Sequence, residues 1–370
     1  MKTNGQRPLR LSRRKRILFS LFTCAFVVVV IMVLAEAFTR MKGFAPLPSP
    51  FLFISLEPPG NYFIPHSTRG YAYSPGEVKV TVPGLPSFKV THASDGSRIT
   101  HPLANGTPGN KKEIWIFGCS FTHGWGLNDE ETYPWLLQRD LPEYEVVNFG
   151  VDGYSTVQSL LQLQETLASG RKPAIVVLSY APFHDGRNAL VRSWKKAVLM
   201  NSHLGPLNFP YATLGSDGRL ALHNEPLQYA GLALLRHSAL ANYLDNRYND
   251  ATVASYDSHN VSIAVVNECW TLCKSNGIEF VLAGILPSFL TSNMLQLFDE
   301  KGLITVDIGV DLGLRENLNP DGHPSAIANK QFAQKLEAFL RAKLINKAGV
   351  PTTPATQIQR QPAHSALKPL

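Results

Sequence analysis

The sequence predicts an α/β fold, a three-layer sandwich with a parallel sheet, preceded by one N-terminal transmembrane helix. Two observations lead to this prediction. Over residues 112–345, short apolar runs typical of buried strands alternate with longer segments that have helical spacing. Before them, residues 17–35 form a run of 19 residues without a charged side chain.

The charge distribution argues against a nucleic-acid-binding body. The chain has 370 residues and a formal net charge of +7. Residues 1–16 hold seven of the 35 basic side chains and no acidic one, so the other 28 basic residues balance the 28 acidic ones. A nucleic-acid partner would need a basic face outside this tail. The four cysteines, Cys24, Cys119, Cys269 and Cys273, are too few and too scattered for a disulfide scaffold or a zinc site.

The uncharged run is long enough to cross a bilayer, because 19 helical residues rise by about 28 Å. Seven positive charges precede it, and only Arg40 and Lys42 follow it closely. This bias predicts a single-pass anchor over 17–37, a basic cytoplasmic tail over 1–16 and an extracytoplasmic body, periplasmic in a Gram-negative bacterium. A cleaved signal peptide is the alternative, because Ala35-Glu36-Ala37 fits a cleavage site.

Composition and spacing divide the rest of the chain into three parts. We expect a linker with two short strands over 38–111, a main domain over 112–345 with an irregular insertion at about 184–255, and a disordered tail over 346–370. Apolar runs predict strands over 114–117, 145–149, 174–180, 278–286 and 303–308. Spacing predicts helices over 132–141, 156–168, 262–277 and 325–344. The apolar residues of the last helix share one face: Ile327, Phe332, Leu336, Phe339, Leu340 and Leu344.

Polar blocks follow three of the predicted strands and precede the last helix. They cover residues 118–124, 150–155, 181–188 and 319–324. Ligands of open parallel sheets bind beyond the carboxyl ends of the strands, so we expect these blocks to meet in space. The blocks supply a serine, Ser120, and an Asp and a His two residues apart, Asp321 and His323. A base that removes the serine proton makes the hydroxyl a nucleophile.

These blocks resemble those of the SGNH hydrolases, also called GDSL esterases and lipases, which have a flavodoxin-like fold. The family's first block, Gly-Asp-Ser-x-Thr-x-Gly, is similar to Gly118-Cys119-Ser120-Phe121-Thr122-His123-Gly124, with Cys119 in place of the Asp. Its second block is similar to VNFGVDGYS at 147–155, and its last to Asp321-Gly322-His323-Pro324. The resemblance covers residues 112–345 and includes several blocks in the family's order.

The resemblance implies a role for each matching residue. Ser120 would be the nucleophile, His323 the general base, and Asp321 the carboxylate that orients the base. The backbone N–H groups of Ser120 and Gly153 would donate to the oxyanion.

The third block departs from the family pattern, which supplies a side-chain amide from Gly-x-Asn-Asp. Here His184 stands where the Asn is expected, and Asn188 offers an amide four residues later. We expect His184 to complete the oxyanion hole, with Asn188 as the alternative. We also expect His123 to line the cleft, and Cys119, Cys269 and Cys273 to pack in the core.

The resemblance implies a serine esterase that forms an acyl-enzyme and needs no metal or organic cofactor. The expected substrate is an O-acylated, chiefly O-acetylated, carbohydrate or another ester of the cell envelope. One alternative is an O-acyltransferase that uses the same triad with a membrane acyl-donor protein. The other is a non-catalytic carbohydrate-binding module, which the altered third block keeps open.

Overall fold

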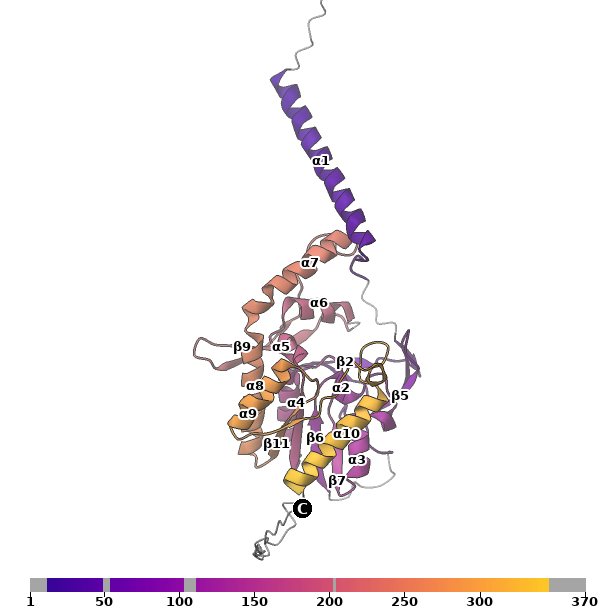
Figure 1. Cartoon of the computed structure of the whole chain (residues 1–370), viewed down its shortest axis with the longest axis vertical. Helices are drawn as coiled ribbons and strands as arrows, with labels where there is room; N and C mark the ends of the chain where they lie inside the picture. Colours follow the sequence, from indigo (N-terminus) through magenta and orange to yellow (C-terminus); the bar gives the residue numbers. More distant parts are fainter. Residues whose placement is uncertain (1–11, 49–53, 103–110, 202–203, 346–370) are drawn as a thin grey trace, which may run out of the picture.

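The computed structural model describes residues 12–48, 54–102, 111–201 and 204–345, with a long helix leading into a layered body (Figure 1). The body is built on five parallel strands: β6 (Lys112–Phe117), β7 (Tyr144–Asn148), β8 (Ile175–Tyr180), β11 (Glu279–Gly284) and β12 (Ile304–Asp307). They lie in the order β12-β11-β8-β6-β7. Numbered within the sheet, this is the flavodoxin-like order 2-1-3-4-5.

Helices cover both faces of the sheet. Along β6, Ile114 and Ile116 point to one face while Trp115 and Phe117 point to the other, as the period of a strand requires. The first face packs against α3 (Tyr133–Asp140) and α10 (Ala326–Leu340). The second packs against α4 (Thr156–Ala168), α8 (Ser258–Ser275) and α9 (Phe289–Glu300). The predicted three-layer α/β fold is therefore confirmed.

Five antiparallel strands precede the main sheet, more than the two expected. They are β1 (Ser55–Glu57), β2 (Phe63–His66), β3 (Gly70–Tyr73), β4 (Gly76–Thr81) and β5 (Phe88–His92). β1, β4 and β5 form one sheet, and β2 pairs with β3. Their aromatic side chains form a third core cluster with Trp125 and Tyr154, which follow β6 and β7. The N-terminal strands thus cover the carboxyl edge of the main sheet.

The expectation of an irregular insertion at 184–255 is wrong. Most of these residues form regular elements: α5 (Phe183–Asn188), α6 (Arg192–Asn201), β9 (Asn208–Leu214), β10 (Leu220–Pro226) and α7 (Ala239–Thr252). β9 and β10 pair as a hairpin, and its turn uses Gly218 at a φ of +75°. The polar composition reflects the solvent-facing sides of α7 and of the hairpin, and buried polar residues of α5 such as Asn188, rather than an absence of structure.

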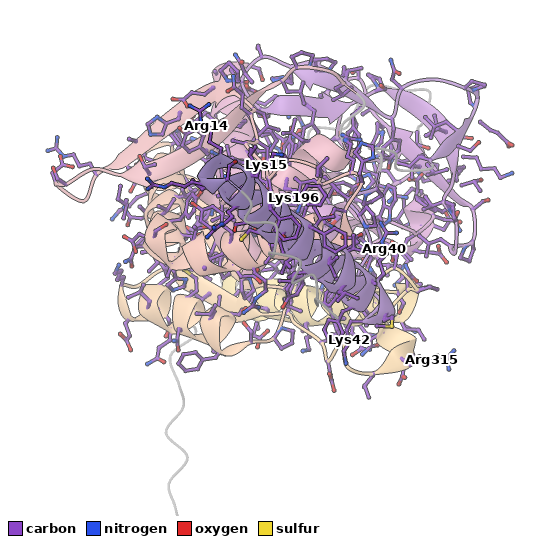
Figure 2. All side chains as sticks on the ribbon, turned by 90° about the horizontal axis from the view of Figure 1, so that it is seen from above. Arg14, Lys15, Arg40, Lys42, Lys196 and Arg315 are labelled. Carbon is purple, nitrogen blue, oxygen red and sulfur yellow. The ribbon has the colours of Figure 1, made fainter. Side chains whose placement is uncertain are left out.

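The N-terminal helix α1 (Arg13–Met41) is long and apolar enough to cross a membrane, and most of its side chains are exposed. Figure 2 shows Arg14 and Lys15 at one end and Arg40 and Lys42 at the other. Its second end is joined to the body. The Glu36 carboxylate accepts hydrogen bonds from the backbone N–H groups of Ala239 and Leu240, each at 2.9 Å, and so caps α7.

Three smaller differences from the sequence prediction remain. Helix α9 was not predicted, and Ile327 is 52% exposed although Phe332, Leu336 and Leu340, expected on the same face, are buried. The predicted disordered tail over 346–370 lies outside the described residues. Short turns of other helix types occur at Asp129–Glu131, Val253–Tyr256, Arg315–Asn317 and Arg341–Ile345.

Candidate active site

Ser120 is the first residue of α2 (Ser120–His123), a single helical turn directly after β6. The turn is tight because small residues surround it. A Cβ on Gly118 would lie 2.1 Å from Oγ1 of Thr122, and a Cβ on Gly150 would lie 2.4 Å from the backbone N of His123. The close approach of these two loops fixes Ser120 at the carboxyl edge of the sheet, where its side chain is nearly buried.

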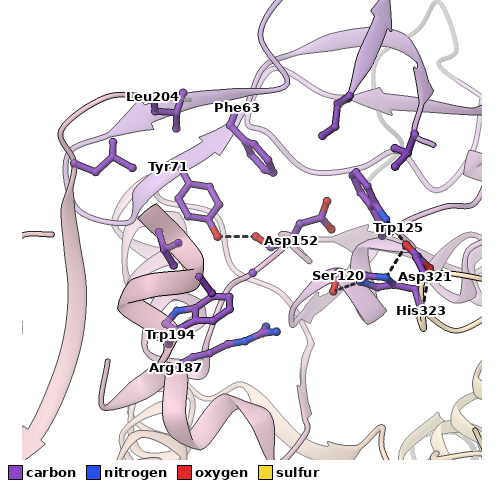
Figure 3. Close-up of a pocket in the computed structure, with 16 residues that line it drawn as sticks. Phe63, Tyr71, Ser120, Trp125, Asp152, Arg187, Trp194, Leu204, Asp321 and His323 are labelled. Carbon is purple, nitrogen blue, oxygen red and sulfur yellow. Dashed lines mark hydrogen bonds and ion pairs between the residues drawn. The ribbon is translucent and has the colours of Figure 1, made fainter. Parts of the chain in front are cut away.

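Asp321 and His323 reach Ser120 from the loop before α10. The backbone N–H of Asn319 donates to the carbonyl of His323 at 2.7 Å and closes this loop. Nδ1 of His323 lies 3.0 Å from Oδ2 of Asp321, and Nε2 lies 3.1 Å from Oγ of Ser120 (Figure 3). Nδ1 therefore carries the proton that it donates to the carboxylate, and Nε2 is left to accept from the serine hydroxyl.

Asp321 is held as a carboxylate. Its Oδ1 accepts from the backbone N–H of His323 at 3.1 Å, and its Oδ2 also accepts from the indole Nε1 of Trp125 at 2.8 Å. Burial alone would raise the pKa of Asp321. The hydrogen bonds and charge of His323, together with the Trp125 bond, outweigh that effect and lower the pKa below its ordinary value. The structure thus brings the three residues together in the order that the sequence predicted.

The triad faces a cleft of about 400 Å³. Aromatic side chains form much of its wall, and Figure 3 shows four of them along the cleft: Trp125 beside the triad, and Phe63, Tyr71 and Trp194 farther from it. Asp152 and Arg187 also line the cleft. The carboxylate of Asp152 is paired with the buried His123 imidazole, whose Nδ1 lies 3.2 Å from Oδ1.

Gly153 lines the cleft beside Ser120, as its expected role requires. Its φ is +76°, and a Cβ here would lie 2.5 Å from the Tyr71 hydroxyl, so only glycine fits. Tyr71 donates to the carbonyl of Asp152 at 2.7 Å, and Tyr73 accepts from the N–H of Asp152 at 2.8 Å, which fixes the turn. Among the described hydrogen bonds, none uses the backbone N–H of Ser120 or Gly153, so both groups are available to a substrate oxygen.

The structure does not bring Asn188 or His184 to the cleft. Asn188 is fully buried: its Oδ1 accepts from Val157 N at 2.8 Å, and its Nδ2 donates to Thr156 and Ser262 at 2.6 and 2.8 Å. This amide is fully used within the fold, and the expectation that it could serve as a donor is wrong.

His184 is also buried, with 1% of its surface exposed, and it is not among the cleft-lining residues. Its Nδ1 accepts from the backbone N–H of Ala181 at 3.3 Å, so Nε2 carries the proton. Burial, and secondly the charge of Arg187, hold the pKa of His184 well below its ordinary value. His184 is therefore a neutral ring beneath the cleft, and the sequence-based placement at the oxyanion is corrected.

His123 does not line the cleft either. It is fully buried, and its Nε2 lies 3.0 Å from Nε2 of His92 while its Nδ1 lies 3.2 Å from Oδ1 of Asp152. Tyr73 stacks on both imidazole rings, with centroid distances of 4.0 Å to His92 and 4.5 Å to His123. Burial lowers the pKa of both histidines. These rings support the cleft floor from below.

The cysteines behave as packing residues. Cys119, Cys269 and Cys273 are buried, and burial raises the pKa of each thiol. Cys119 therefore stays a thiol beside the nucleophile. Among the described residues, no group of three or more His, Cys, Asp or Glu side chains is placed to hold a metal ion.

Sequence reasoning assigned no role to two side chains that shape the site, Arg98 and Arg187, whereas an aromatic residue of the insertion such as Trp194 was expected either to shape a substrate groove or to pack in a lid. Arg98 is buried and donates to the carbonyls of His123 and Gly124, at 3.0 and 2.8 Å, so it holds the loop after the nucleophile. Arg187 and Trp194 come from α5 and α6 and line the cleft. The helical spacing of α5 could have identified Arg187, because Arg187 lies on a different face from His184 and Asn188. No local feature of the sequence indicates that Arg98 is buried.

Comparison with known proteins finds similarity to solved esterase structures. No protein-family model and no curated protein matches the sequence. The chain is similar to the psychrotrophic esterase EstA from a Pseudoalteromonas species, at 15% identity and a TM-score of 0.39, over 64% of this chain and 100% of that one. It is also similar to a lipolytic G-D-S-L family protein from Veillonella parvula, at 12% identity and a TM-score of 0.36, over 62% and 99% of the two chains. An acetyl xylan esterase, Est2A from Butyrivibrio proteoclasticus, shares 13% identity at a TM-score of 0.35, over 65% and 66%.

The chain has an SGNH-type fold. We base this assignment on the chain's own strand order and on the positions of its blocks. The first and second blocks follow β6 and β7, and the last precedes α10, so that all three meet at the carboxyl edge of the sheet. The SGNH-type body places a serine, an imidazole and a carboxylate in hydrogen-bonding sequence at an open cleft.

Proposed function

We propose that the protein is a serine esterase that works through an acyl-enzyme. The observation that carries this proposal is the hydrogen-bonded series from Asp321 through His323 to Ser120 at an open cleft. Oγ of Ser120 attacks the ester carbonyl carbon and passes its proton to Nε2 of His323, while the carbonyl π electrons move to oxygen. The bond to the alcohol then breaks, and the leaving oxygen takes the proton from His323. Water repeats the sequence and releases the acid.

The two available backbone donors support catalysis over a purely binding role. A non-catalytic module has no need for a nucleophile, a base and two unpaired N–H groups around one point. The N–H groups of Ser120 and Gly153 border the same cleft as the serine hydroxyl. Such donors are most valuable where negative charge develops during the reaction.

The substrate that we propose is an O-acylated, chiefly O-acetylated, carbohydrate of the cell envelope. Support comes from the cleft, which is lined by aromatic rings and by the Asp152 carboxylate. Aromatic faces and hydrogen-bond acceptors suit the apolar faces and hydroxyl groups of a sugar. We place the body outside the cytoplasm because of the charge bias around α1.

An O-acyltransferase is the second candidate, and one contact favours it. Trp194 and Val198 of α6 line the cleft, and Lys196 on the same helix donates to Asn242 and Asp245 of α7, both at 2.8 Å. The N-terminus of α7 is capped by α1. One cleft wall is therefore linked to the helix that would enter the membrane, where an acyl-donor protein would lie.

Purified full-length protein in detergent tests the proposal with p-nitrophenyl acetate. We expect turnover that Ser120→Ala removes and that Ser169→Ala, a change at the exposed end of α4, leaves intact. A folded Ser120→Ala protein that keeps most of the activity would contradict the mechanism. Addition of an oligosaccharide acceptor then separates the two enzymes: acyl transfer that outpaces hydrolysis identifies the transferase.

Reporter fusions after residues 60 and 345 test the location. We expect alkaline phosphatase to be active at both positions. A fluorescent reporter that folds only in the cytoplasm should stay dark at both. The reverse pattern rejects the extracytoplasmic placement. A mature chain that begins after residue 37 would show that the helix is a signal sequence rather than an anchor.

A further inference from the structure

The cleft contains an arginine that neither the sequence motifs nor the triad explains. Among the cleft-lining residues that the structure describes, Arg187 carries the only fixed positive charge. Its guanidinium lies over the rings of Phe183 and Trp194, with centroid distances of 4.4 and 4.5 Å. It also donates to the carbonyl of Tyr154 at 3.1 Å. Figure 3 shows the side chain extended toward Ser120.

Most of the hydrogen-bonding capacity of Arg187 is unused. A guanidinium has five N–H donors, and the Tyr154 carbonyl is its one acceptor among the described hydrogen bonds. The two rings and the carbonyl hold the group in place before any ligand arrives, so little side-chain entropy is lost on binding. Arg187 is thus a preorganised, partly satisfied cation that borders the same cleft as the nucleophile.

We propose that Arg187 is the third oxyanion donor, acting with the backbone N–H groups of Ser120 and Gly153. This inference rests on the proposed esterase function. When Ser120 attacks, the carbonyl oxygen gains the π electron pair, and the guanidinium stabilises that charge without giving up a proton. When the intermediate collapses, the pair re-forms the carbonyl and the bond to the alcohol breaks. A cation replaces the neutral amide that the family resemblance implies, and charge-assisted hydrogen bonds are about twice as strong as neutral ones.

Arg192 offers a matched control. Its guanidinium also lies over two rings, Tyr229 at 4.8 Å and Tyr248 at 5.0 Å, and it donates to the carbonyl of Ala230 at 2.9 Å. It is not among the residues that line the cleft. Arg192 also donates to Oδ1 of Asn249 at 3.0 Å and lies 3.6 Å from the Asp245 carboxylate. Arg192→Ala therefore removes the same kinds of ring and carbonyl contacts as Arg187→Ala, and more polar partners, without touching the cleft.

The experiment uses the full-length protein in detergent, with p-nitrophenyl acetate as a neutral ester and a fluorophosphonate as a second probe of Ser120. We expect Arg187→Ala to lower kcat by about 10²–10³, the usual cost of one lost oxyanion donor, with KM little changed. Phosphonylation of Ser120 should slow in parallel. Guanidinium ion should restore part of the rate to Arg187→Ala, and Arg187→Gln should lose less than Arg187→Ala. Arg192→Ala should keep the wild-type kcat.

Several results would overturn the assignment. A folded Arg187→Ala protein with wild-type kcat excludes the role, and equal losses in Arg187→Ala and Arg192→Ala, with lowered Tm and no guanidinium rescue, show a structural role. A rise in KM for p-nitrophenyl acetate with kcat unchanged shows that Arg187 binds the substrate rather than the oxyanion. Loss of kcat in His184→Ala but not in Arg187→Ala moves the donor to His184. If the wild-type protein hydrolyses the ester through Ser120, each of these results rejects the role of Arg187 and leaves the esterase function standing. If the wild-type protein reacts with neither probe, both the esterase function and the role of Arg187 are rejected.

Discussion

Arg98 links the N-terminal strands to the loop that follows the nucleophile, and its replacement gives the sharpest test of how the site is built. The side chain has no exposed surface. Its Nε donates to Oδ1 of Asp129 at 2.8 Å. The other guanidinium nitrogens donate to backbone carbonyls, those of His123, Gly124, Leu127 and Lys89, at distances of 3.0, 2.8, 2.7 and 3.1 Å. Arg98→Met keeps a side chain of related length and removes every one of these bonds.

The expected cost is large because the partners stay buried. Asp129 is 1% exposed, and its Oδ2 has no hydrogen bond in the described structure even in the wild type. Removal of one member of a buried ion pair costs about 3–5 kcal/mol. For a body of this size, each kcal/mol lowers Tm by about 2–4 °C, so Arg98→Met should lower Tm by roughly 6–20 °C. Esterase activity should fall as well, since the carbonyls just after Ser120 lose their anchor.

Thermal unfolding followed by circular dichroism measures this effect. Arg139→Met is the control, because Arg139 pairs with Asp140 at 2.8 Å and its side chain is 61% exposed. Exposed pairs contribute about 0–1 kcal/mol, so Tm should hardly change. The double variant Arg98→Met with Asp129→Leu should recover part of the lost stability. The reasoning fails if Arg98→Met unfolds at the wild-type temperature, or if the double variant is no better than the single one.

Three further predictions concern the triad and the oxyanion turn. Ser120→Ala and His323→Ala should each abolish ester turnover, and the double variant should be no slower than either one, because the residues act as a unit; additive losses in steady-state rates would contradict this. Gly153→Ala should lower both kcat and Tm, since the Cβ meets the Tyr71 hydroxyl at 2.5 Å and an L residue at positive φ costs about 1–2 kcal/mol; adding Tyr71→Phe should relieve only the steric part. The lowered pKa of Asp321 contributes stability that is present above its ordinary pKa of about 3.9 and lost as pH falls through the lowered value. Urea unfolding of the wild type and Asp321→Asn should therefore give a difference that is present at pH 5 and above and shrinks below that ordinary pKa, whereas a difference that persists in acid would refute the assignment.

Local patterns predicted the main sheet because its central strands β6, β8 and β11 are buried on both faces. Ile114 and Trp115 are both fully buried although they point to opposite sides, which produces an uninterrupted apolar run in the sequence. Helix α4 has the predicted bounds because its apolar positions repeat with helical spacing along one buried face. The triad could also be predicted from the sequence, because Ser120 comes shortly after β6, and Asp321 and His323 come shortly before α10.

The features that the sequence did not predict depend on contacts between residues far apart in the chain. The N-terminal strands and the 184–255 insertion bury aromatic side chains in one shared cluster that includes Tyr71, Phe209 and Trp125. No local period shows that these segments meet. Arg98 is a similar case, since an arginine between short strands is ordinarily exposed and becomes buried only because Asp129 and several carbonyls surround it.

The third block, residues 181–188, contains the candidate side chains for the third oxyanion donor. The helical spacing of α5 distinguishes them by the face on which each one lies. In α5, His184 and Asn188 are four residues apart and therefore share one face, so both must point to the cleft or neither can. The structure turns that face into the core. Phe183 and Arg187 form the other such pair, and the guanidinium lies over the Phe183 ring at 4.4 Å on the cleft side. Because α5 is helical, the donor must come either from the face of His184 and Asn188 or from the face of Phe183 and Arg187. The first face is buried, and the Asn188 amide on it is already hydrogen-bonded within the fold.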